Sequence, residues 1–503
     1  MSDLRTWLEW VEALGQLQRV AAPVDWDEEL GAITYLVASR ENAPALLFEN
    51  VCGHPGWRVL SNLIGSSLDR LALTLGLPPG LRPLECIAAS RERVRRRLPP
   101  VEVAWAEAPL AARVWQGAEV DLTALPAPKF WPRDGGRYVG SGTVLITRHP
   151  ETGTLNLGTY RQMLHGPREV GVYISPGKDG LQHLQAAWRR GETLPAVAVY
   201  GLDPLLLVVG SQSFGAHTSE YDVAGGIRGE PVAVVQGPVT GLPIPATAEI
   251  AVEGFLDPDA LRREGPLGEF TGYYGRPAGA APVLRVEALY CREQPILTAA
   301  MAAEYPICEQ ALFIALARAA RLWDDLERLG VPGIRGVYAH PAAAAGFAMV
   351  VVSLEQRYAG HAAQVLALAA QAPSTAYYTK WIIAVDEDVD PSDLNQVLWA
   401  LSVRCHPTRD IDLLRRTWST PLDPSQNDEA DRPYGAKVLI NACRDLRPPG
   451  HTAPRALLRE QTYRRVAARW GELGFVGAPP RPPALDPGEA PLPAETKFAA
   501  GVE

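Results

Sequence analysis

Short runs of β-branched and apolar residues, separated by Gly, Pro and Asp turns, fill residues 120–290 and limit the possible folds more than any other feature. The runs are Gly142–Thr147, Val170–Ile174, Ala196–Tyr200, Leu205–Val209, Val232–Val235, Ala248–Val252 and Val283–Leu289. Regularly spaced short strands of this kind are typical of antiparallel sheets that curl into barrels. We therefore predict an open or closed antiparallel barrel in the middle of the chain.

Helical and mixed patterns flank this region. On its N-terminal side, helices are predicted over residues 4–14 and 27–40, followed by a strand at Ala45–Glu49. On its C-terminal side, the broad apolar stripe of Ala302–Gly330 predicts a long helix that connects two domains. The later strands and helices are Ala348–Ser353, His361–Gln371, Trp381–Val385 and Asp393–Leu401. Their alternation predicts a second, smaller α/β domain.

These patterns together predict an α/β (α+β) chain in five parts. An N-terminal α/β region takes residues 1–115, the barrel takes 116–305 and the connector helix takes 306–330. A C-terminal α/β domain takes 331–475 and ends in a helix at Leu457–Leu473. The tail, 476–503, is rich in Pro and Ala, and we expect it to be disordered or to lie over a neighbouring molecule.

Charge and cysteine usage exclude several classes of protein. The net charge is −9, from 48 basic and 57 acidic residues, which argues against a protein that binds nucleic acid electrostatically. No apolar run approaches the roughly 18–20 residues of a membrane span, and the N-terminus has no signal-peptide pattern. The six cysteines are scattered, without a CxxC pair, as expected for reduced thiols in a cytoplasmic protein.

Two glutamates are five residues apart in the run Arg263–Tyr274. Glu264 and Glu269 flank Gly-Pro-x-Gly, a spacer that fits neither a helix interior nor a central strand. A defined loop of this kind would hold two carboxylates close together, where repulsion and burial raise one pKa. The alternative is a surface turn with two solvated acids.

Three further segments combine polar groups that a barrel loop has little structural reason to contain. Asn156–Arg161 ends in an arginine that suits a carboxylate or phosphate. Ser175–His183 is a Gly-rich turn entering a helix, which suits a phosphate. Ser219–Asp222, together with Asn156, would give the oxygen-rich ligand set of Mg²⁺ or Mn²⁺.

With these segments in view, the chain resembles the UbiD family of decarboxylases, which use prenylated FMN. The resemblance extends from the N-terminal helices to about Phe475. It rests on Asn156-x₄-Arg161, Ser219-Glu220-Tyr221, Glu264-Gly-Pro-x-Gly-Glu269-x-x-Gly272-Tyr273, Tyr358-Ala-Gly-His361, Thr379-Lys380, Asp386–Asp390 and Leu398-Trp399-Ala400.

The resemblance implies a prenylated-FMN-binding split barrel in the middle and an α/β oligomerisation domain at the C-terminal end. It implies a catalytic network of Arg161, Glu264 and Glu269 beside the reactive ring. It also implies Asn156 and Glu220 as ligands of a divalent ion, Mn²⁺ or Mg²⁺, with K⁺ nearby. The remaining residues that it places at the cofactor are Thr159, Tyr160, Gly177, Lys178 and Lys380, and Phe270 is a candidate wall of the substrate pocket.

One position departs from the family pattern. Relatives place a ligand histidine just after the strand equivalent to Val172–Ile174, whereas this chain has Gly177-Lys178-Asp179 there. His183 follows one helical turn later and is the predicted third metal ligand. Asp179 or water is the alternative.

The function implied is reversible, non-oxidative decarboxylation of an aromatic, heteroaromatic or α,β-unsaturated carboxylic acid. Prenylated FMN would serve as a covalent electron sink, and Glu269 as the general acid/base. A flavin prenyltransferase would supply the cofactor, and the enzyme would be a homodimer or a trimer of dimers. The alternative function is an FMN-dependent oxidoreductase on a similar barrel.

Overall fold

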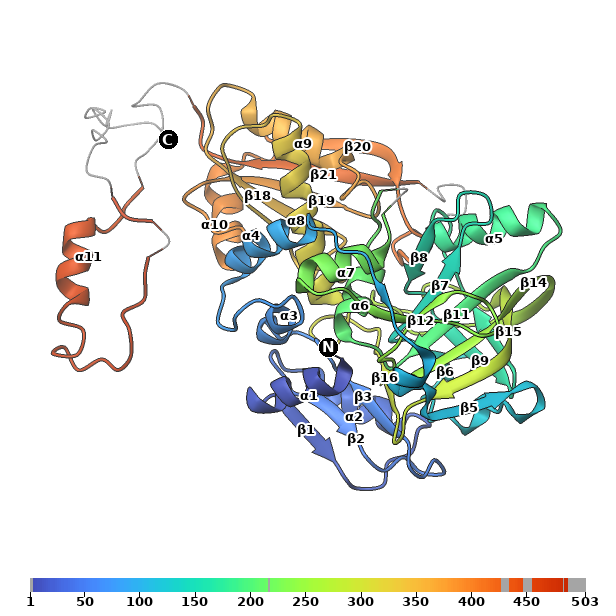
Figure 1. Cartoon of the computed structure of the whole chain (residues 1–503). Coiled ribbons are helices and arrows are strands. Elements are labelled where there is room, and N and C mark those ends of the chain that lie inside the picture. Colours follow the sequence, from blue (N-terminus) through green and yellow to red (C-terminus); the bar gives the residue numbers. More distant parts are fainter. Residues whose placement is uncertain (1–2, 216–217, 427–433, 447–454, 483, 487–503) are drawn as a thin grey trace, which may run out of the picture. The chain divides into compact units, whose positions relative to one another are not determined.

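The computed structural model describes residues 3–215, 218–426, 434–446, 455–482 and 484–486 (Figure 1). These residues form two compact units. The first contains the described residues of Met1–Arg321, Ala339–Ala348 and Ser419–Pro433. The second contains those of Leu322–Tyr338, Met349–Trp418 and Tyr434–Glu503.

The first unit begins with a small sheet that confirms the predicted N-terminal α/β pattern. Its strands run in the order β1 (Leu17–Val20), β2 (Ala45–Phe48), β3 (Arg58–Ser61) and β16 (Ile296–Ala299). Helix α1 (Leu4–Ala13) buries Leu4, Trp7, Leu8 and Val11 against this sheet, since these residues repeat on one helix face. Helix α2 (Glu29–Ala38) lies within the predicted second helix, and α3 (Leu68–Thr74) and α4 (Pro83–Val94) follow.

A nine-stranded sheet forms the centre of the first unit. Its strand path is β6 (Tyr138–Gly140), β9 (Gln162–Gly166), β10 (Glu169–Val172), β15 (Gly279–Cys291), β14 (Ile250–Glu264), β11 (Leu194–Tyr200), β7 (Thr143–Arg148) and β8 (Leu155–Gly158), with β5 (Arg113–Gln116) beside β15. Every pairing is antiparallel, and the path stays open. The open form of the predicted barrel is thus confirmed, and α5 (Asp179–Arg189) packs on β7, β8 and β11.

Two of the predicted strands of this region have another place in the fold. Leu205–Val209 was predicted as a strand, which is wrong, because it lies in the buried helix α6 (Pro204–Gly210). Pro204 suits a first helical position, and Asp203 caps the helix by accepting the N–H of Leu205 at 3.0 Å. The strand predicted at Val232–Val235 exists as β12 (Ala233–Gln236), but in a separate sheet with β4 (Val101–Glu102) and β13 (Pro243–Pro245).

The second unit confirms the predicted α/β pattern. Its sheet has the order β17 (Ile334–Ala339), β18 (Met349–Leu354), β19 (Trp381–Asp386), β21 (Tyr434–Ala442) and β20 (Ile411–Trp418). Strands β18, β19 and β21 are parallel, which requires crossover connections such as α9 (His361–Gln371) and α10 (Leu394–Arg404). The long helix predicted over Ala302–Gly330 is α8 (Ala311–Arg328), and both this helix and the C-terminal helix α11 (Glu460–Ala467) are shorter than predicted.

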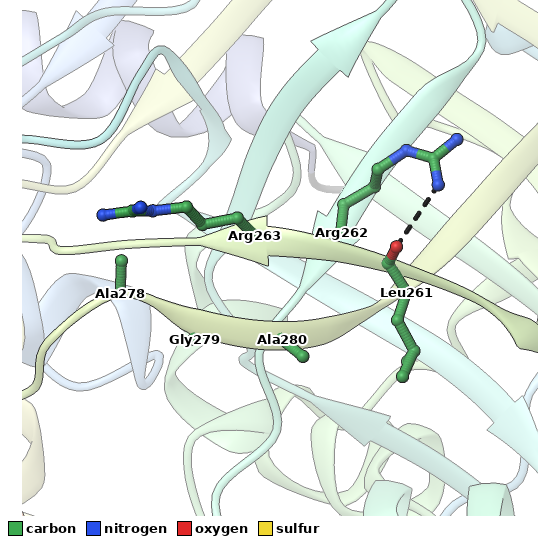
Figure 2. Close-up of a pocket in the computed structure, with 6 residues that line it drawn as sticks. All are labelled: Leu261, Arg262, Arg263, Ala278, Gly279 and Ala280. Carbon is green, nitrogen blue, oxygen red and sulfur yellow. Dashed lines mark hydrogen bonds between the residues drawn. The ribbon is translucent and has the colours of Figure 1, made fainter.

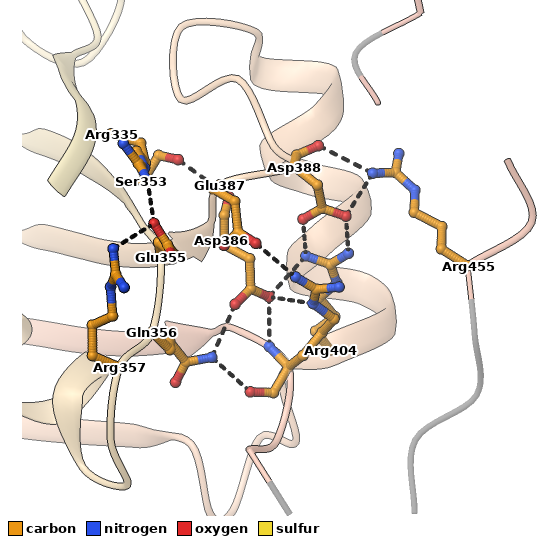
Figure 3. A network of polar contacts seen from close by, with 11 residues as sticks. Arg335, Ser353, Glu355, Gln356, Arg357, Asp386, Glu387, Asp388, Arg404 and Arg455 are labelled. Carbon is orange, nitrogen blue, oxygen red and sulfur yellow. Dashed lines mark hydrogen bonds and ion pairs between the residues drawn. The ribbon is translucent and has the colours of Figure 1, made fainter. Parts of the chain in front are cut away.

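The acidic run after β19 pairs with arginines (Figure 3). Arg404 donates to Asp388 through both terminal nitrogens, at 2.9 and 2.8 Å, and to Asp386 at 3.0 Å. Arg455 adds a bond of 2.8 Å to Asp388, and Arg444 lies 3.3 Å from Asp386. Despite burial, these arginines lower the pKa of Asp388 to about 2. The run therefore ties β19 to α10 and to the segment around Arg455.

None of the described helices is long and apolar enough to cross a membrane. The prediction of a disordered or docked tail falls largely on residues 483 and 487–503, which lie outside the described part of the chain.

Candidate active site

The Glu264–Glu269 loop joins β14 to β15, the two longest strands of the central sheet. Glu264 is the last residue of β14 and is paired with Gly279 on β15. The carboxylate of Asp134 accepts the N–H groups of Gly268 and Trp131, both at 3.0 Å. The Trp131 ring fills the space of a Cβ at position 268, 2.4 Å away, so only glycine fits there.

Both glutamate side chains point into the protein. Glu264 is fully buried, and the Glu269 side chain is 12% exposed. The alternative of a surface turn with solvated acids is therefore wrong.

Arg161 joins the two glutamates. It lies between β8 and β9, and its Nε and Nη2 donate to Oε1 and Oε2 of Glu264 at 2.8 and 2.9 Å. Its Nη1 donates to Oε1 of Glu269. Tyr138 on β6 donates its hydroxyl to Glu264 Oε1 at 2.9 Å. Glu264 thus accepts three hydrogen bonds, two of them from the charged guanidinium of Arg161.

Burial raises the pKa of Glu269 to about 7; the Arg161 charge opposes this shift, while Glu264 and Asp134 add to it. For Arg161, the two glutamates outweigh burial and raise the pKa of the guanidinium further. Burial and Glu264 also raise the pKa of Tyr138. At neutral pH the site thus holds a fixed Arg161–Glu264 ion pair and one carboxyl, Glu269, close to its titration midpoint.

Phe270, the residue after Glu269, makes an aromatic contact. It is buried, and its ring centre is 5.2 Å from that of Phe347. The guanidinium of Arg318 on α8 lies 4.9 Å from the Phe347 ring. Phe270 therefore connects the glutamate loop to Phe347, which in turn contacts Arg318 on α8.

Tyr160 ties the predicted cofactor segment to the start of α5. Its buried ring occupies the space that side chains at Gly158 and Gly180 would need, with Cβ distances of 2.2 and 2.7 Å. Its hydroxyl accepts the N–H of Gly180 at 3.1 Å and faces Asn156 Nδ2 at 3.4 Å. The N–H of Thr159 donates to the carbonyl of Gly210 on α6.

Positive charge gathers where α5 begins. Gly177 has φ +84°, a conformation that lets the chain turn into Lys178, the N-cap of α5. Burial lowers the pKa of Lys178; Asp179 opposes this shift, whereas Arg318 and Arg321 lower the pKa further. A helix N-terminus with nearby lysine and arginine charges is suited to a phosphate group.

His183 lies on the face of α5 that meets β7. Its Nδ1 is 2.9 Å from the hydroxyl of Thr147, which is paired with Asn156 in the sheet. Burial and the neighbouring His149 lower the pKa of His183 to about 4, so the ring is neutral. Nε2 of a neutral imidazole is a competent metal ligand when the other nitrogen is held by a hydrogen bond.

Glu220 begins α7 (Glu220–Arg228) and is almost fully buried. Its Oε2 accepts the N–H of Leu157, the residue after Asn156, at 2.9 Å. Burial raises the pKa of Glu220 to about 7, and the charges of Asp179 and Asp222 act in the same direction. A buried carboxylate in an excess of negative charge fits a bound cation.

The fit to a metal site is partial. Across the described residues, no three His, Cys, Asp or Glu side chains are grouped as metal ligands. The candidate donors in this part of the first unit are the Asn156 amide, Glu220 and either His183 or Asp179. Lys380 precedes β19 in the second unit, with its ammonium 5.5 Å from the Tyr378 ring. Its role at the cofactor stays a prediction.

A shallow hollow lies on the β14–β15 pair beside Glu264 (Figure 2). It is lined by Leu261, Arg262, Arg263, Ala278, Gly279 and Ala280. Arg262 also binds Glu169 at 3.1 and 3.2 Å on the exposed side of the sheet.

Sequence reasoning missed four residues of the site: Asp134, Tyr138, Tyr173 and Arg276. The guanidinium of Arg276 lies 3.9 Å from the centre of the Tyr173 ring. None of the four stands in a recognisable pattern with the glutamates. Asp134 and Tyr138 meet the loop from more than a hundred positions away, because β6 enters the same sheet.

Comparison with known proteins identifies the family of this chain. The chain matches the family models of all three domains of 3-octaprenyl-4-hydroxybenzoate carboxy-lyase. The N-terminal domain matches residues 8–96, the Rift-related domain residues 101–305 and the C-terminal domain residues 311–442. A phenolic acid decarboxylase of Streptomyces is 33% identical over 89% of this chain and 93% of its own.

Solved structures give the same result. Vanillic acid decarboxylase of Sedimentibacter hydroxybenzoicus in closed form is 29% identical, with a TM-score of 0.83 over 95% of this chain and 99% of that chain. The UbiD-class enzyme HmfF of Pelotomaculum thermopropionicum in complex with FMN is 28% identical, with a TM-score of 0.80 over 90% and 97%. An evolved dimeric form of HmfF in complex with prFMN is 27% identical, with a TM-score of 0.77 over 90% and 97%.

These matches together define a carboxy-lyase. The chain belongs to the UbiD family of decarboxylases.

Proposed function

We propose that this enzyme decarboxylates a phenolic or related aromatic carboxylic acid with bound prenylated FMN, and that Glu269 is the general acid. The observation that supports the proposal best is a buried Glu269, with a pKa of about 7, held by the Arg161–Glu264 ion pair. A carboxyl poised near neutral pH is the group that general acid catalysis needs. The named activities of the relatives support an aromatic acid as the substrate.

The residues of this chain hold and move a proton. Arg161 binds both glutamates, so the carboxyl group of Glu269 is held in one position rather than free to rotate. After the bond to CO₂ breaks, Glu269 gives its proton to the ring carbon that carried the carboxylate. The ion pair with Glu264 balances the charge of Arg161. In the reverse direction, Glu269 removes the same proton.

The flavin, when bound, supplies the electron sink that decarboxylation of an aromatic acid requires. Lys178, Gly177, Thr159 and Tyr160 would hold it, with Lys178 at its phosphate. Asn156 and Glu220 would hold Mn²⁺ or Mg²⁺ beside that phosphate, with His183, Asp179 or water as the third ligand and K⁺ nearby. A flavin prenyltransferase would supply the cofactor.

The decisive experiment combines intact mass, absorption spectroscopy and CO₂ release. The protein is co-produced with a flavin prenyltransferase, with Mn²⁺ and K⁺ present, and is then given a panel of hydroxybenzoic, heteroaromatic and cinnamic acids. A bound flavin heavier than FMN by one prenyl unit, with CO₂ release from a panel member, is expected. Unmodified FMN with turnover of a nicotinamide substrate instead would favour the oxidoreductase alternative.

Activity should fall at high pH because only protonated Glu269 can donate. The free-enzyme pKa is about 7, so kcat/KM for decarboxylation should decline about tenfold per pH unit above this value. Arg161, Glu264 and Asp134 are the charged groups that set this pKa. Initial rates of CO₂ release from pH 5.5 to 9.5 test the prediction, and a constant kcat/KM up to pH 9 would contradict it.

Removal of Glu220 should release metal without unfolding the chain. In a Glu220→Ala variant, we expect metal affinity to fall by at least about tenfold. Metal and flavin per protein are measured by elemental analysis and absorption after dialysis. Glu192→Ala, at an exposed glutamate paired with Arg190, is the matched control. Parallel His183→Ala and Asp179→Ala variants identify the third ligand, and full metal occupancy in Glu220→Ala would contradict the assignment.

A further inference from the structure

Arg276 lies near the end of the glutamate loop, shortly before β15 begins at Gly279. Its Nη1 is buried and has no hydrogen-bond partner within the described part of the chain. Oε2 of Glu264 is 3.6 Å from this nitrogen, within ion-pair range but too far for a hydrogen bond. The Arg161 guanidinium lies 4.8 Å from the same Tyr173 ring that Arg276 contacts. Two guanidinium groups therefore share one aromatic neighbour beside the two glutamates.

The two arginines differ in how their donors are used. All three nitrogens of the Arg161 guanidinium donate to Glu264 or Glu269. Glu264 takes two of these bonds and a third from Tyr138. Arg276 has a buried nitrogen with no acceptor, which is unfavourable unless a ligand supplies one. A planar guanidinium is the side chain best suited to a carboxylate.

The charges of the site also favour a carboxylate as the ligand. With Glu269 protonated, Arg161, Arg276 and Glu264 together have a net charge of about +1, while the Asp134 carboxylate is bound by the backbone N–H groups of Trp131 and Gly268. A substrate carboxylate brings this to zero, whereas with Glu269 ionised the site is already neutral. Binding of an anion and retention of the Glu269 proton therefore favour each other.

We propose that Arg276, rather than Arg161, binds the carboxylate of the aromatic acid. The inference rests on the proposed function for the identity of its ligand. When the carbon–carbon bond breaks, the carboxylate leaves as CO₂, and the electron pair of that bond ends in the new bond between the ring carbon and hydrogen. That carbon takes the proton of Glu269, which becomes a carboxylate beside the two arginines. The site thus keeps its charge balance on both sides of the reaction.

The test measures binding rather than turnover. Titration calorimetry is carried out on holoenzyme in a Glu269→Gln background, which removes the general acid and imitates its neutral form. The probes are 4-hydroxybenzoate and 4-hydroxybenzamide, which differ in charge but hardly in shape. Arg276→Gln is compared with Arg276→Lys and with Arg263→Gln. Arg263 lies exposed in the neighbouring hollow (Figure 2) and has no role in the proposed site.

In Arg276→Gln, the Kd of the acid should rise about 10- to 100-fold, as expected for loss of a charged hydrogen bond. The Kd of the amide should change less than about threefold, and Arg276→Lys should recover part of the acid binding. Arg263→Gln should match the parent for both probes. An unchanged Kd for the acid, equal weakening of acid and amide, or no acid binding by the parent would overturn the inference.

CO₂ release by the wild-type enzyme separates the two proposals. If the acid binds through Arg276 but no acid in the panel releases CO₂, the proposed function fails and the inference stands. If CO₂ is released while Arg276→Gln binds the acid normally, the inference fails and the proposed function stands.

Discussion

The Glu269→Gln variant is expected to lose about 10²–10⁴-fold in kcat for decarboxylation, because it removes the group that returns a proton to the ring carbon. Glutamine keeps the size of the side chain and can still accept a bond from Arg161 Nη1, so the loop should keep its conformation. Flavin and metal content should equal those of the wild type. The measurement is the initial rate of CO₂ release at saturating substrate, with cofactor content from absorption spectra.

Two further variants show whether the loss of rate is due to the carboxyl group of Glu269. Glu269→Asp keeps a carboxyl group at a shorter reach and should recover part of the rate. Glu287→Gln, on β15, alters a half-exposed glutamate paired with Arg168 and should leave the rate unchanged. Wild-type turnover in Glu269→Gln with normal cofactor content would show that another group donates the proton.

The Arg161→Met variant is expected to lose about 3–5 kcal/mol of unfolding free energy. It leaves Glu264 fully buried without its bidentate partner. Because the Arg161 charge lowers the pKa of Glu269, its removal should raise that pKa further. Glu269 would then be protonated but no longer held in position toward the substrate. A displacement of its carboxyl group by about 1 Å would lower the rate on the order of 10²-fold. Denaturant unfolding and CO₂ release measure the two effects.

Arg262→Met provides the matched control for stability. Arg262 also makes a bidentate pair with a glutamate, Glu169, but the two side chains are 50% and 32% exposed. Loss of such a solvated pair should cost less than about 1 kcal/mol. If both variants lost the same small amount, burial of the Arg161–Glu264 pair would not be the source of its importance.

The two arginines of the site therefore separate two tasks. Arg161 holds the glutamates and, with Glu264, sets the electrostatic surroundings of Glu269. Arg276 has a buried donor to offer to a ligand. Loss of Arg161 should change stability and the pH profile, whereas loss of Arg276 should change the affinity for anionic substrates.

Local sequence determined the secondary structure wherever one periodic pattern was present. The alternation in residues 120–290 specified an antiparallel sheet, because strand side chains alternate between faces. The Gly-Pro-x-Gly spacer specified a loop between its two glutamates, since neither residue type fits a regular element there. The run Leu205–Val209 has no such alternation, and the prediction of a strand there was wrong because the cap at Asp203 and Pro204 starts a helix.

The chemistry of the loop was decided by tertiary structure. Pairing of β14 with β15 and entry of β6 into the same sheet bring Tyr138, Asp134 and Arg276 to the glutamates. The spacing of residues in the sequence does not predict contacts between residues this far apart in the chain. Burial, the largest cause of the raised Glu269 pKa, also exists only in the folded chain. The sequence by itself thus determined which residues could do acid–base chemistry, whereas packing decided which glutamate titrates near neutral pH, because desolvation depends on the whole fold.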